Sequence, residues 1–216
     1  MATVKSTRRL HAAARLVALC ATTLLLACVT DTGTDTGVVR PVLKKKRAVP
    51  AVPVALDAWA RVGKDIWRST PNEAQAGPTD DIGFLVSLRE RGDFRFSVDY
   101  FISADTNSGV FIRCRNPLRI TPGTCYEINI WDQHPKQAWR TGSVVTYAQP
   151  VAQIDGLERW VRLEIEARGT TIKAWFDGVQ TVEFDGATAA RGRIALQYGG
   201  GGRLRFRNPS VVPLEP

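Results

Sequence analysis

The feature that most limits what this chain can fold into is an alternation of apolar and polar residues that begins near Gly83. Side chains on a β-strand point alternately to its two faces, so this period of two is typical of strands with one buried face. The domain beyond residue 52 contains no convincing helical period. The apolar positions of the alternating segments are Phe94, Phe96, Val98, Tyr100 and Ile102; Val110 and Ile112; Tyr126, Ile128 and Ile130; Val161, Leu163, Ile165 and Ala167; and Ile172, Ala174 and Phe176.

Glycine, aspartate and asparagine separate these segments, as they do at turns between strands. Asp177-Gly178 is a two-residue hairpin signal, and Val179–Phe184 is the expected returning strand. Arg193–Tyr198 and Arg203–Val211 complete the series. Many short strands at this spacing favour a sandwich or barrel. We therefore predict an all-β domain over residues 53–216, built as a two-sheet jelly-roll sandwich.

The N-terminus has the pattern of an export signal. Four basic residues and no acidic ones precede Cys28, and the apolar run 16–27 is shorter than the ~20 residues that cross a bilayer as a helix. The run ends in Leu25-Leu26-Ala27-Cys28, which resembles the lipobox of bacterial lipoproteins. We predict a lipoprotein signal peptide over residues 1–28 and a lipid on Cys28. The alternative is an ordinary cleaved signal peptide. Val29 after the cysteine favours the outer membrane, facing the periplasm or the cell surface.

Residues 29–52 repeat Asp-Thr-Gly and then become basic, with too little apolar periodicity to pack. We predict a disordered tether there. The formal charge of +8 divides into +4 for residues 1–28, +3 for the tether and +1 for the remainder. A nucleic-acid partner is not expected, because the folded domain has almost no net charge. The basic run 44–47 either contacts anionic headgroups near the anchor or is simply solvated, so membrane contact is expected through the lipid anchor alone.

Two cysteines, Cys114 and Cys125, fall within the predicted domain. In an exported protein we expect them to form a disulfide at the base of a long hairpin loop. Simple alternation places Cys114 with Val110 and Ile112, but Cys125 on the opposite face. A bulge or a strong twist is therefore needed to bring the two sulfurs together.

The alternation also predicts a polar face. If Tyr126, Ile128 and Ile130 face the core, the residues between them face away from it. One sheet would then present Phe111, Arg113, Glu127, Asn129 and Trp131 on its outer surface. Aromatic rings cover the apolar faces of a sugar, and charged and amide groups bond its hydroxyls. This sugar-site prediction depends on Arg113 and Glu127 sharing one surface.

At these residues the chain resembles the 3-keto-disaccharide hydrolase domain family, over about residues 53–214. The resemblance rests on four motifs in the order of the family: Asn107-Ser108-Gly109-Val110-Phe111-Ile112-Arg113 with Tyr126-Glu127-Ile128-Asn129-Ile130-Trp131-Asp132, then Thr141-Gly142-Ser143, then Gly192-Arg193-Ile194-Ala195-Leu196-Gln197-Tyr198, then Phe206-Arg207-Asn208. It implies a concanavalin-like jelly roll. The family more often has Gln at the position that Asn129 occupies here, which puts substrate contacts at this position in doubt.

The resemblance implies chemistry on sugars oxidised at C3, in which a base removes the C2 proton and the C1 substituent leaves. Glu127 and His134 are the candidate bases. Arg113 would hold the enolate oxygen, and Asp132 would orient His134. Glu127, Asp132 and His134 together would bind a divalent metal, the one cofactor that these residues suggest. The candidate substrate-binding residues are Asn107, Phe111, Asn129, Trp131, Trp139 and Gln197.

Each of these residues also has a structural alternative. Arg113 and Glu127 would form an ordinary cross-strand ion pair, His134 would be a surface bystander, and Trp139 would belong to the core. Asn107 would only shape a turn, and Gln197 would only bond a neighbouring strand.

Three classes of function therefore stay open. If the domain is an enzyme acting on a small carbohydrate, we expect a deep site where Glu127, Asp132 and His134 converge. A lectin-like binding domain predicts a shallow groove lined by Trp131 and Trp139. A structural envelope lipoprotein predicts no concave face at all. The sequence does not give the oligomeric state.

Overall fold

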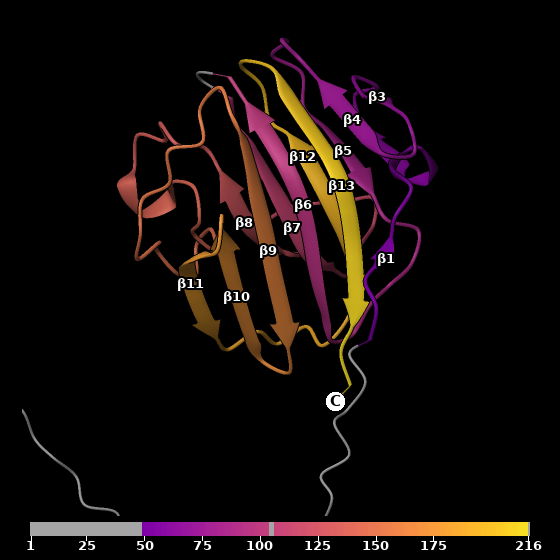
Figure 1. Ribbon diagram of the computed structural model, residues 1–216, viewed down its shortest axis with the longest axis vertical. Helices are drawn as coiled ribbons and strands as arrows, with labels where there is room; N and C mark the ends of the chain where they lie inside the picture. The colour runs from indigo at the N-terminus through magenta and orange to yellow at the C-terminus, as the bar shows by residue number, and fades with distance from the viewer. Residues whose placement is uncertain (1–48, 104–105, 216) are drawn as a thin grey trace, which may run out of the picture. The chain divides into compact units, whose positions relative to one another are not determined.

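The computed structural model describes residues 49–103 and 106–215, and these form two layers of antiparallel strands (Figure 1). The predicted signal peptide, Cys28 and nearly all of the predicted tether lie outside the described residues. The strands are β1 (Val52–Pro53), β2 (Ala60–Gly63), β3 (Arg68–Ser69), β4 (Glu73–Ala76), β5 (Gly83–Val86), β6 (Phe94–Ile102), β7 (Ser108–Cys114), β8 (Tyr126–Ile130), β9 (Trp160–Arg168), β10 (Thr171–Phe176), β11 (Val179–Asp185), β12 (Arg193–Tyr198) and β13 (Leu204–Pro213). Two short 3-10 helices, η1 (Leu56–Ala58) and η2 (Gln137–Trp139), complete the elements.

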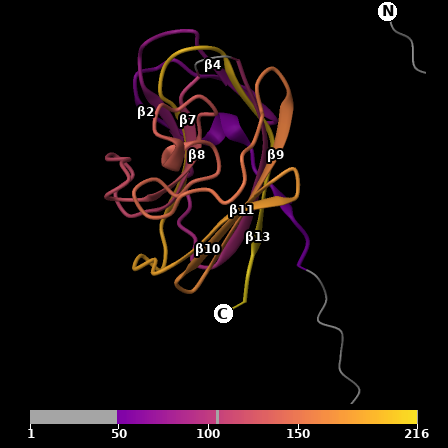
Figure 2. The same ribbon diagram turned by 90° about the vertical axis from the view of Figure 1, so that its left-hand side faces the viewer.

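The larger sheet has the order β11-β10-β9-β6-β13-β4-β3, with β1 added against β13. The smaller sheet has the order β2-β5-β12-β7-β8. Figure 2 shows the sandwich from the side, with the loops that follow β7 and β8 gathered beside the smaller sheet and away from the larger one. The all-β, two-sheet prediction is confirmed.

The core lies between the two sheets and follows the alternation in the sequence. Phe94, Phe96, Val98, Tyr100 and Ile102 of β6 are all completely buried. The alternating apolar residues predicted for β7, β8, β9 and β10 join the same cluster. Their intervening neighbours face outward, because the pleat has a period of two.

The Asp177-Gly178 hairpin is also confirmed. Both residues have positive φ, 49° and 79°, as a type I′ turn between β10 and β11 requires. The sequence did not predict β1 to β4, and Val52 of β1 pairs with Val211 one residue before the expected domain boundary. Among the described residues, no helix is long and apolar enough to cross a membrane.

One break in the alternation lies near the end of β7. Arg113 has a φ of 52°, and the pairing of β7 with β12 shifts register between Arg193 and Ala195. A side chain at Gly192 would come within 2.3 Å of the Arg113 carbonyl carbon, so this close approach needs glycine. The break places Cys114 in the same outer cluster as Phe111. Cys114 and Cys125 form a disulfide, as predicted.

The same break turns Arg113 inward. Its guanidinium is completely buried and donates to the carbonyls of Gly169 (2.6 Å) and Ala189 (3.0 Å). It also pairs with the Asp93 carboxylate at 3.1 Å. Gly169 lies in the turn between β9 and β10, so Arg113 connects the smaller sheet to the larger one.

We predict that Arg113→Met lowers the free energy of unfolding by about 3–5 kcal/mol. Loss of the guanidinium leaves its buried hydrogen-bond partners unpaired, and they cannot reach water. Denaturant titration at neutral pH measures this loss. The matched control is Arg95→Met, which breaks the half-exposed pair with Glu166 and should cost at most ~1 kcal/mol. Equal losses in the two variants would contradict the structural role of Arg113.

Candidate functional site

The outer face of the smaller sheet is defined by the register of its strands. One row of cross-strand neighbours contains Ala60, Val86, Ala195, Phe111 and Glu127, and the next contains Val62, Phe84, Gln197, Gly109 and Asn129. Most of the first row is apolar and packs beneath the disulfide loop, together with Ile120. Polar side chains therefore gather at the β7–β8 side of the face.

Glu127 is the most unusual residue on this face. The residue is 7% exposed, and its side chain lies over Gly109, where a Cβ atom would be 2.9 Å from Glu127 Oε1. Within the described residues its carboxylate has no hydrogen bond and no ion pair. Burial raises its pKa from 4.5 to about 8, because water no longer stabilises the charged form. A carboxyl group whose pKa lies within about one unit of neutral pH is suited to proton transfer.

Two side-chain amides on the same face of the sheet make no hydrogen bond to the described residues. Gln197 is next to Gly109 across β12, and its Oε1 is buried without a hydrogen-bond partner in the described part of the chain. Asn107 comes directly before β7, with its amide against Gly199, where a Cβ atom would be 2.6 Å from Nδ2. We refer to Asn107, Glu127 and Gln197 as the Glu127 cluster. Unsatisfied buried polar groups on one surface are typical of a site that a ligand completes.

A second group of side chains lies on the loop after β8. The His134 ring is 4.4 Å from Trp131 and 5.6 Å from Trp139, measured between centroids. The Lys136 ammonium lies 4.4 Å above the Trp139 ring. We refer to Trp131, His134 and Trp139 as the aromatic loop cluster. His134 Nδ1 accepts a hydrogen bond from the Lys136 N–H at 3.0 Å.

Asn129 connects this loop to the sheet and is not a free substrate contact. Its side-chain nitrogen donates to the Trp139 carbonyl, and its backbone bonds Gly142 and Ser143. The amide expected to contact sugar therefore positions the loop.

Asp132 also has a structural position. It accepts hydrogen bonds from the Thr141 hydroxyl and from the Gly156 N–H at 2.6 Å. Burial raises the pKa of Asp132, and the hydrogen bond from Thr141 partly offsets that effect. Asp132 makes no contact with His134, so the expectation that it orients this histidine is wrong. It lines a separate pocket of about 330 Å³ with Arg140 and Thr141.

The described residues contain no group of three His, Cys, Asp or Glu side chains close enough to hold a metal ion. Glu127, Asp132 and His134 do not converge there, so these three residues do not fit the predicted metal. The deep three-residue site expected of an enzyme is not formed.

The predicted position of Arg113 is also wrong. Glu127 projects outward beside Phe111, whereas Arg113 points inward to Gly169 and Asp93. The predicted sugar site that depended on Arg113 and Glu127 sharing one surface is therefore wrong. Phe111 is 1% exposed and packs edge-on against Phe84 at 5.7 Å, so it is not an open platform.

The structure confirms the expected outward direction of Glu127, and it places Gln197 beside Gly109. The sequence alone does not reveal the part that Gly109 plays. The sequence Asn107-Ser108-Gly109 is typical of a turn or a pocket rim, but Ser108 and Gly109 belong to β7. The Ser108 hydroxyl donates a hydrogen bond to the Gln197 carbonyl at 2.7 Å. A glycine inside a strand is a signal of close approach by a neighbour, and here that neighbour is Glu127.

The fold and the polar outer face together define a jelly-roll domain of the carbohydrate-related type. The chain belongs to the family of 3-keto-alpha-glucoside-1,2-lyase-like domains, whose model matches residues 54–212. No curated protein matches the chain.

Several solved structures share the fold. A Parabacteroides distasonis protein, named provisionally as a glycosyl hydrolase, has a TM-score of 0.60 at 21% identity, covering 69% of this chain and 91% of that one. The carbohydrate-binding module CBM66 from Bacillus subtilis has a TM-score of 0.54 at 19% identity, covering 69% and 92%. The lumenal domain of VIP36 in its Ca²⁺- and mannose-bound form has a TM-score of 0.55 at 7% identity, covering 73% and 84%. At these identities the likeness establishes the fold alone.

We predict that Glu127→Gln changes how stability depends on pH. The folded-state pKa of Glu127 lies above its ordinary value, so its contribution to stability is full below pH 4.5 and is lost as pH rises through 8. Between these values wild-type stability should fall, relative to the variant, by about 1.4 kcal/mol per pH unit. Denaturant titrations from pH 5 to pH 9 measure the difference, and parallel curves for the two proteins would contradict a buried, unpaired Glu127.

Proposed function

We propose that this domain cleaves 3-keto-glycosides by elimination, with Glu127 as the proton-transfer group. The observation that supports this most directly is the buried carboxylate of Glu127, which is unpaired among the described residues and has a pKa raised to about 8. Membership of a 3-keto-alpha-glucoside-1,2-lyase-like family points to the same substrate class.

The chemistry follows from the acidity of a carbon next to a ketone. Ionised Glu127 removes the C2 proton, and the electron pair forms an enolate with the oxygen at C3. In this mechanism the amide N–H groups of Asn107 and Gln197 donate hydrogen bonds to that oxygen. The enolate then re-forms the ketone, makes a C1=C2 double bond and expels the C1 oxygen. This oxygen takes the proton from Glu127, so one residue serves as base and then as acid.

A second candidate is carbohydrate binding without turnover. The aromatic loop cluster supports it, because Trp131 and Trp139 are only half-buried and tryptophan faces are suited to sugar C–H surfaces. Binding alone does not explain the Glu127 cluster, since a carboxyl group that is largely protonated at neutral pH is a poor acceptor for sugar hydroxyls.

The test is incubation of the purified domain with a 3-keto-glucoside, followed by detection of the released aglycone. We expect Glu127→Gln to lower kcat/KM by about 10²-fold or more, which is the usual contribution of a positioned proton-transfer group. For the wild type, kcat/KM should rise with pH and level off above about 8, where Glu127 is ionised. A chelator added in parallel tests the divalent metal separately.

His134→Ala is the matched control, because it changes the aromatic loop cluster and leaves the Glu127 cluster unaltered. It should change KM more than kcat. Undiminished turnover in Glu127→Gln would remove Glu127 from the reaction. Saturable binding of the glucoside by the wild type, without any release of aglycone, would favour the binding function.

The cellular setting is also a proposal. The lipobox-like sequence at Cys28 supports a lipid-anchored protein of the cell envelope, with the domain exported and attached through its N-terminal tether. Loss of radiolabelled fatty acid from the protein in Cys28→Ala would support this, and retained label would contradict it.

A further inference from the structure

The outer face of the larger sheet, on the opposite side of the sandwich from Glu127, carries an ordered row of side chains. Arg68, Gln75, Arg205, Phe101 and Trp160 are successive cross-strand neighbours on β3, β4, β13, β6 and β9. At ~4.8 Å between adjacent strands the row is roughly 19 Å long. Cations, an amide and aromatic rings therefore follow one line across the surface.

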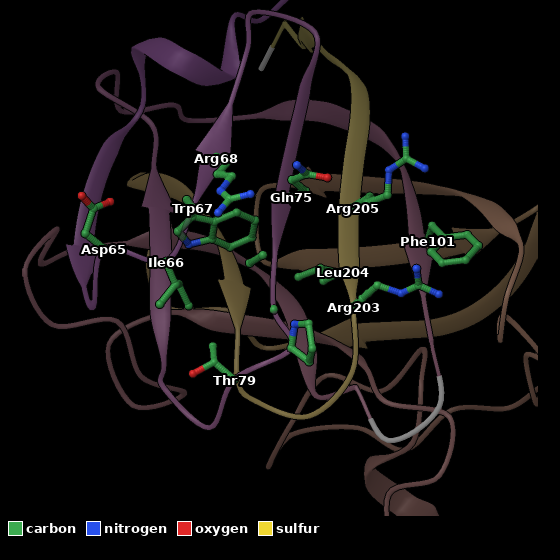
Figure 3. A pocket seen from close by; sticks show the side chains of 13 residues that line it. Asp65, Ile66, Trp67, Arg68, Gln75, Thr79, Phe101, Arg203, Leu204 and Arg205 are labelled. Carbon is green, nitrogen blue, oxygen red and sulfur yellow. The ribbon is translucent and has the colours of Figure 1, made fainter.

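A groove of about 670 Å³ lies at the β3–β4 end of this row. Figure 3 shows Arg68, Gln75 and Arg205 projecting from β3, β4 and β13, with Arg203 just before β13. Phe101 is also part of its lining. The groove thus combines three guanidinium groups with an amide and an aromatic ring.

The positive charge of the groove is only partly balanced. Arg68 and Arg203 are exposed, and neither side chain has a hydrogen bond or ion pair within the described ranges. Arg205 pairs with Glu73 at 2.8 Å. Asp65 lines the same groove, but its carboxylate pairs with Arg61 at 3.1 Å. Two guanidinium groups are left to attract an anion.

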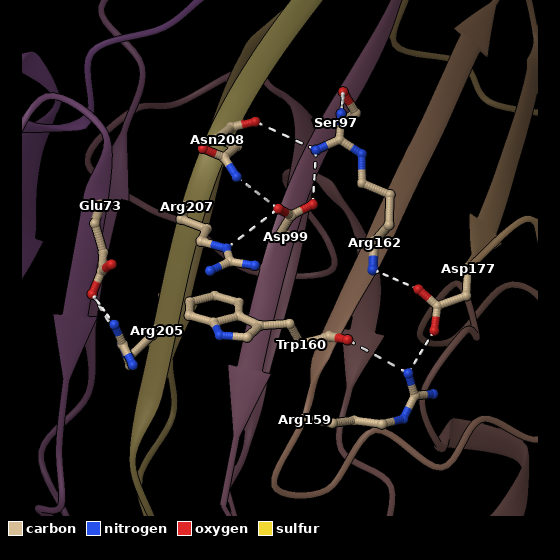
Figure 4. A network of polar contacts seen from close by, with 10 residues as sticks. All are labelled: Glu73, Ser97, Asp99, Arg159, Trp160, Arg162, Asp177, Arg205, Arg207 and Asn208. Atoms are coloured by element: carbon tan, nitrogen blue, oxygen red, sulfur yellow. Dashed lines mark hydrogen bonds and ion pairs between the residues drawn. The ribbon is translucent and has the colours of Figure 1, made fainter.

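The β9 end of the row is held in place by a polar network (Figure 4). Asp99 accepts hydrogen bonds from Arg162 at 2.8 Å and from the Asn208 amide at 2.8 Å, and it pairs with Arg207 at 3.4 Å. The Arg207 guanidinium lies 3.8 Å from the centre of the Trp160 ring. These contacts lower the pKa of Asp99 despite partial burial, so the network stays charged. The aromatic end is therefore fixed before any ligand arrives.

We infer that this row and its groove form a second binding site, for an acidic oligosaccharide that bears carboxylate or sulfate groups. Guanidinium groups form bidentate hydrogen bonds with such anions, so Arg68 and Arg203 would bind the charged substituents. Phe101 offers a ring edge, and Gln75 offers an amide for sugar hydroxyls. The length of the row fits several linked sugars better than one. This site goes beyond the proposed lyase function and does not rest on it.

The test is calorimetric binding of oligogalacturonate to the intact protein at physiological ionic strength, with a neutral malto-oligosaccharide of equal length as the comparison. We expect saturable binding of the acidic oligosaccharide only. Arg68→Gln combined with Arg203→Gln should weaken it about tenfold or more, because both exposed cations are lost. The control removes two other exposed arginines, Arg89→Gln with Arg119→Gln, and should leave the affinity within about twofold.

Three results would each overturn the oligosaccharide site. Equal weakening in the two double variants would show general charge attraction in its place. If inorganic sulfate competed for the site as well as the acidic oligosaccharide does, the site would be a simple anion site. Binding to phosphatidylglycerol vesicles without binding to oligogalacturonate would replace it with a membrane surface. Glu127→Gln should leave this binding unchanged, and Arg68→Gln with Arg203→Gln should leave keto-glucoside turnover unchanged, so the two proposals fail independently.

Discussion

The reversal of side-chain direction at Arg113 is the constraint on which the rest of this structure depends. One residue with positive φ moves Cys114 to the outer face, where the disulfide closes the 115–124 loop over Phe111. The same residue directs its guanidinium into the interior, where it bonds Gly169 of the larger sheet. The terminal guanidinium nitrogens of this buried cation bond Gly169 and Asp93, and these contacts span the two layers. Loop closure and sheet stacking are thus coupled at a single bulge.

The sequence was informative wherever the period of two was unbroken. It placed the apolar side chains of β6, β9 and β10 correctly, and it placed Glu127 on the outer face, because β8 contains no bulge. It failed at β1 to β4, since strands as short as Arg68–Ser69 are too brief to show a period. It failed at Arg113 because the residue types give no sign of a bulge, and a bulge inverts the inferred direction of the residues that follow it in the same strand. The contact between Glu127 and Gly109 depends on register across strands, which no single segment encodes.

The two outer faces of the sandwich differ in their chemistry. The smaller sheet presents the Glu127 carboxyl group, which burial makes weakly acidic. The larger sheet presents guanidinium groups, some held by Asp99 and Glu73 and some without partners in the described residues. Solved structures of this architecture include a carbohydrate-binding module, so the fold alone does not choose between binding and catalysis. Individual side chains decide between binding and catalysis. Here the smaller sheet supports catalysis, and the larger sheet supports binding.

Gly109 has a consequence that reaches beyond conformation. It contributes no functional group, yet the empty space above its Cα is what allows the Glu127 carboxyl group to lie flat on the sheet, away from water. Alanine at this position would push the carboxyl group toward solvent and make it a stronger acid. The two positions are therefore epistatic: the effect of a change at residue 127 depends on what occupies residue 109. Homologues that vary at one of them should vary at the other.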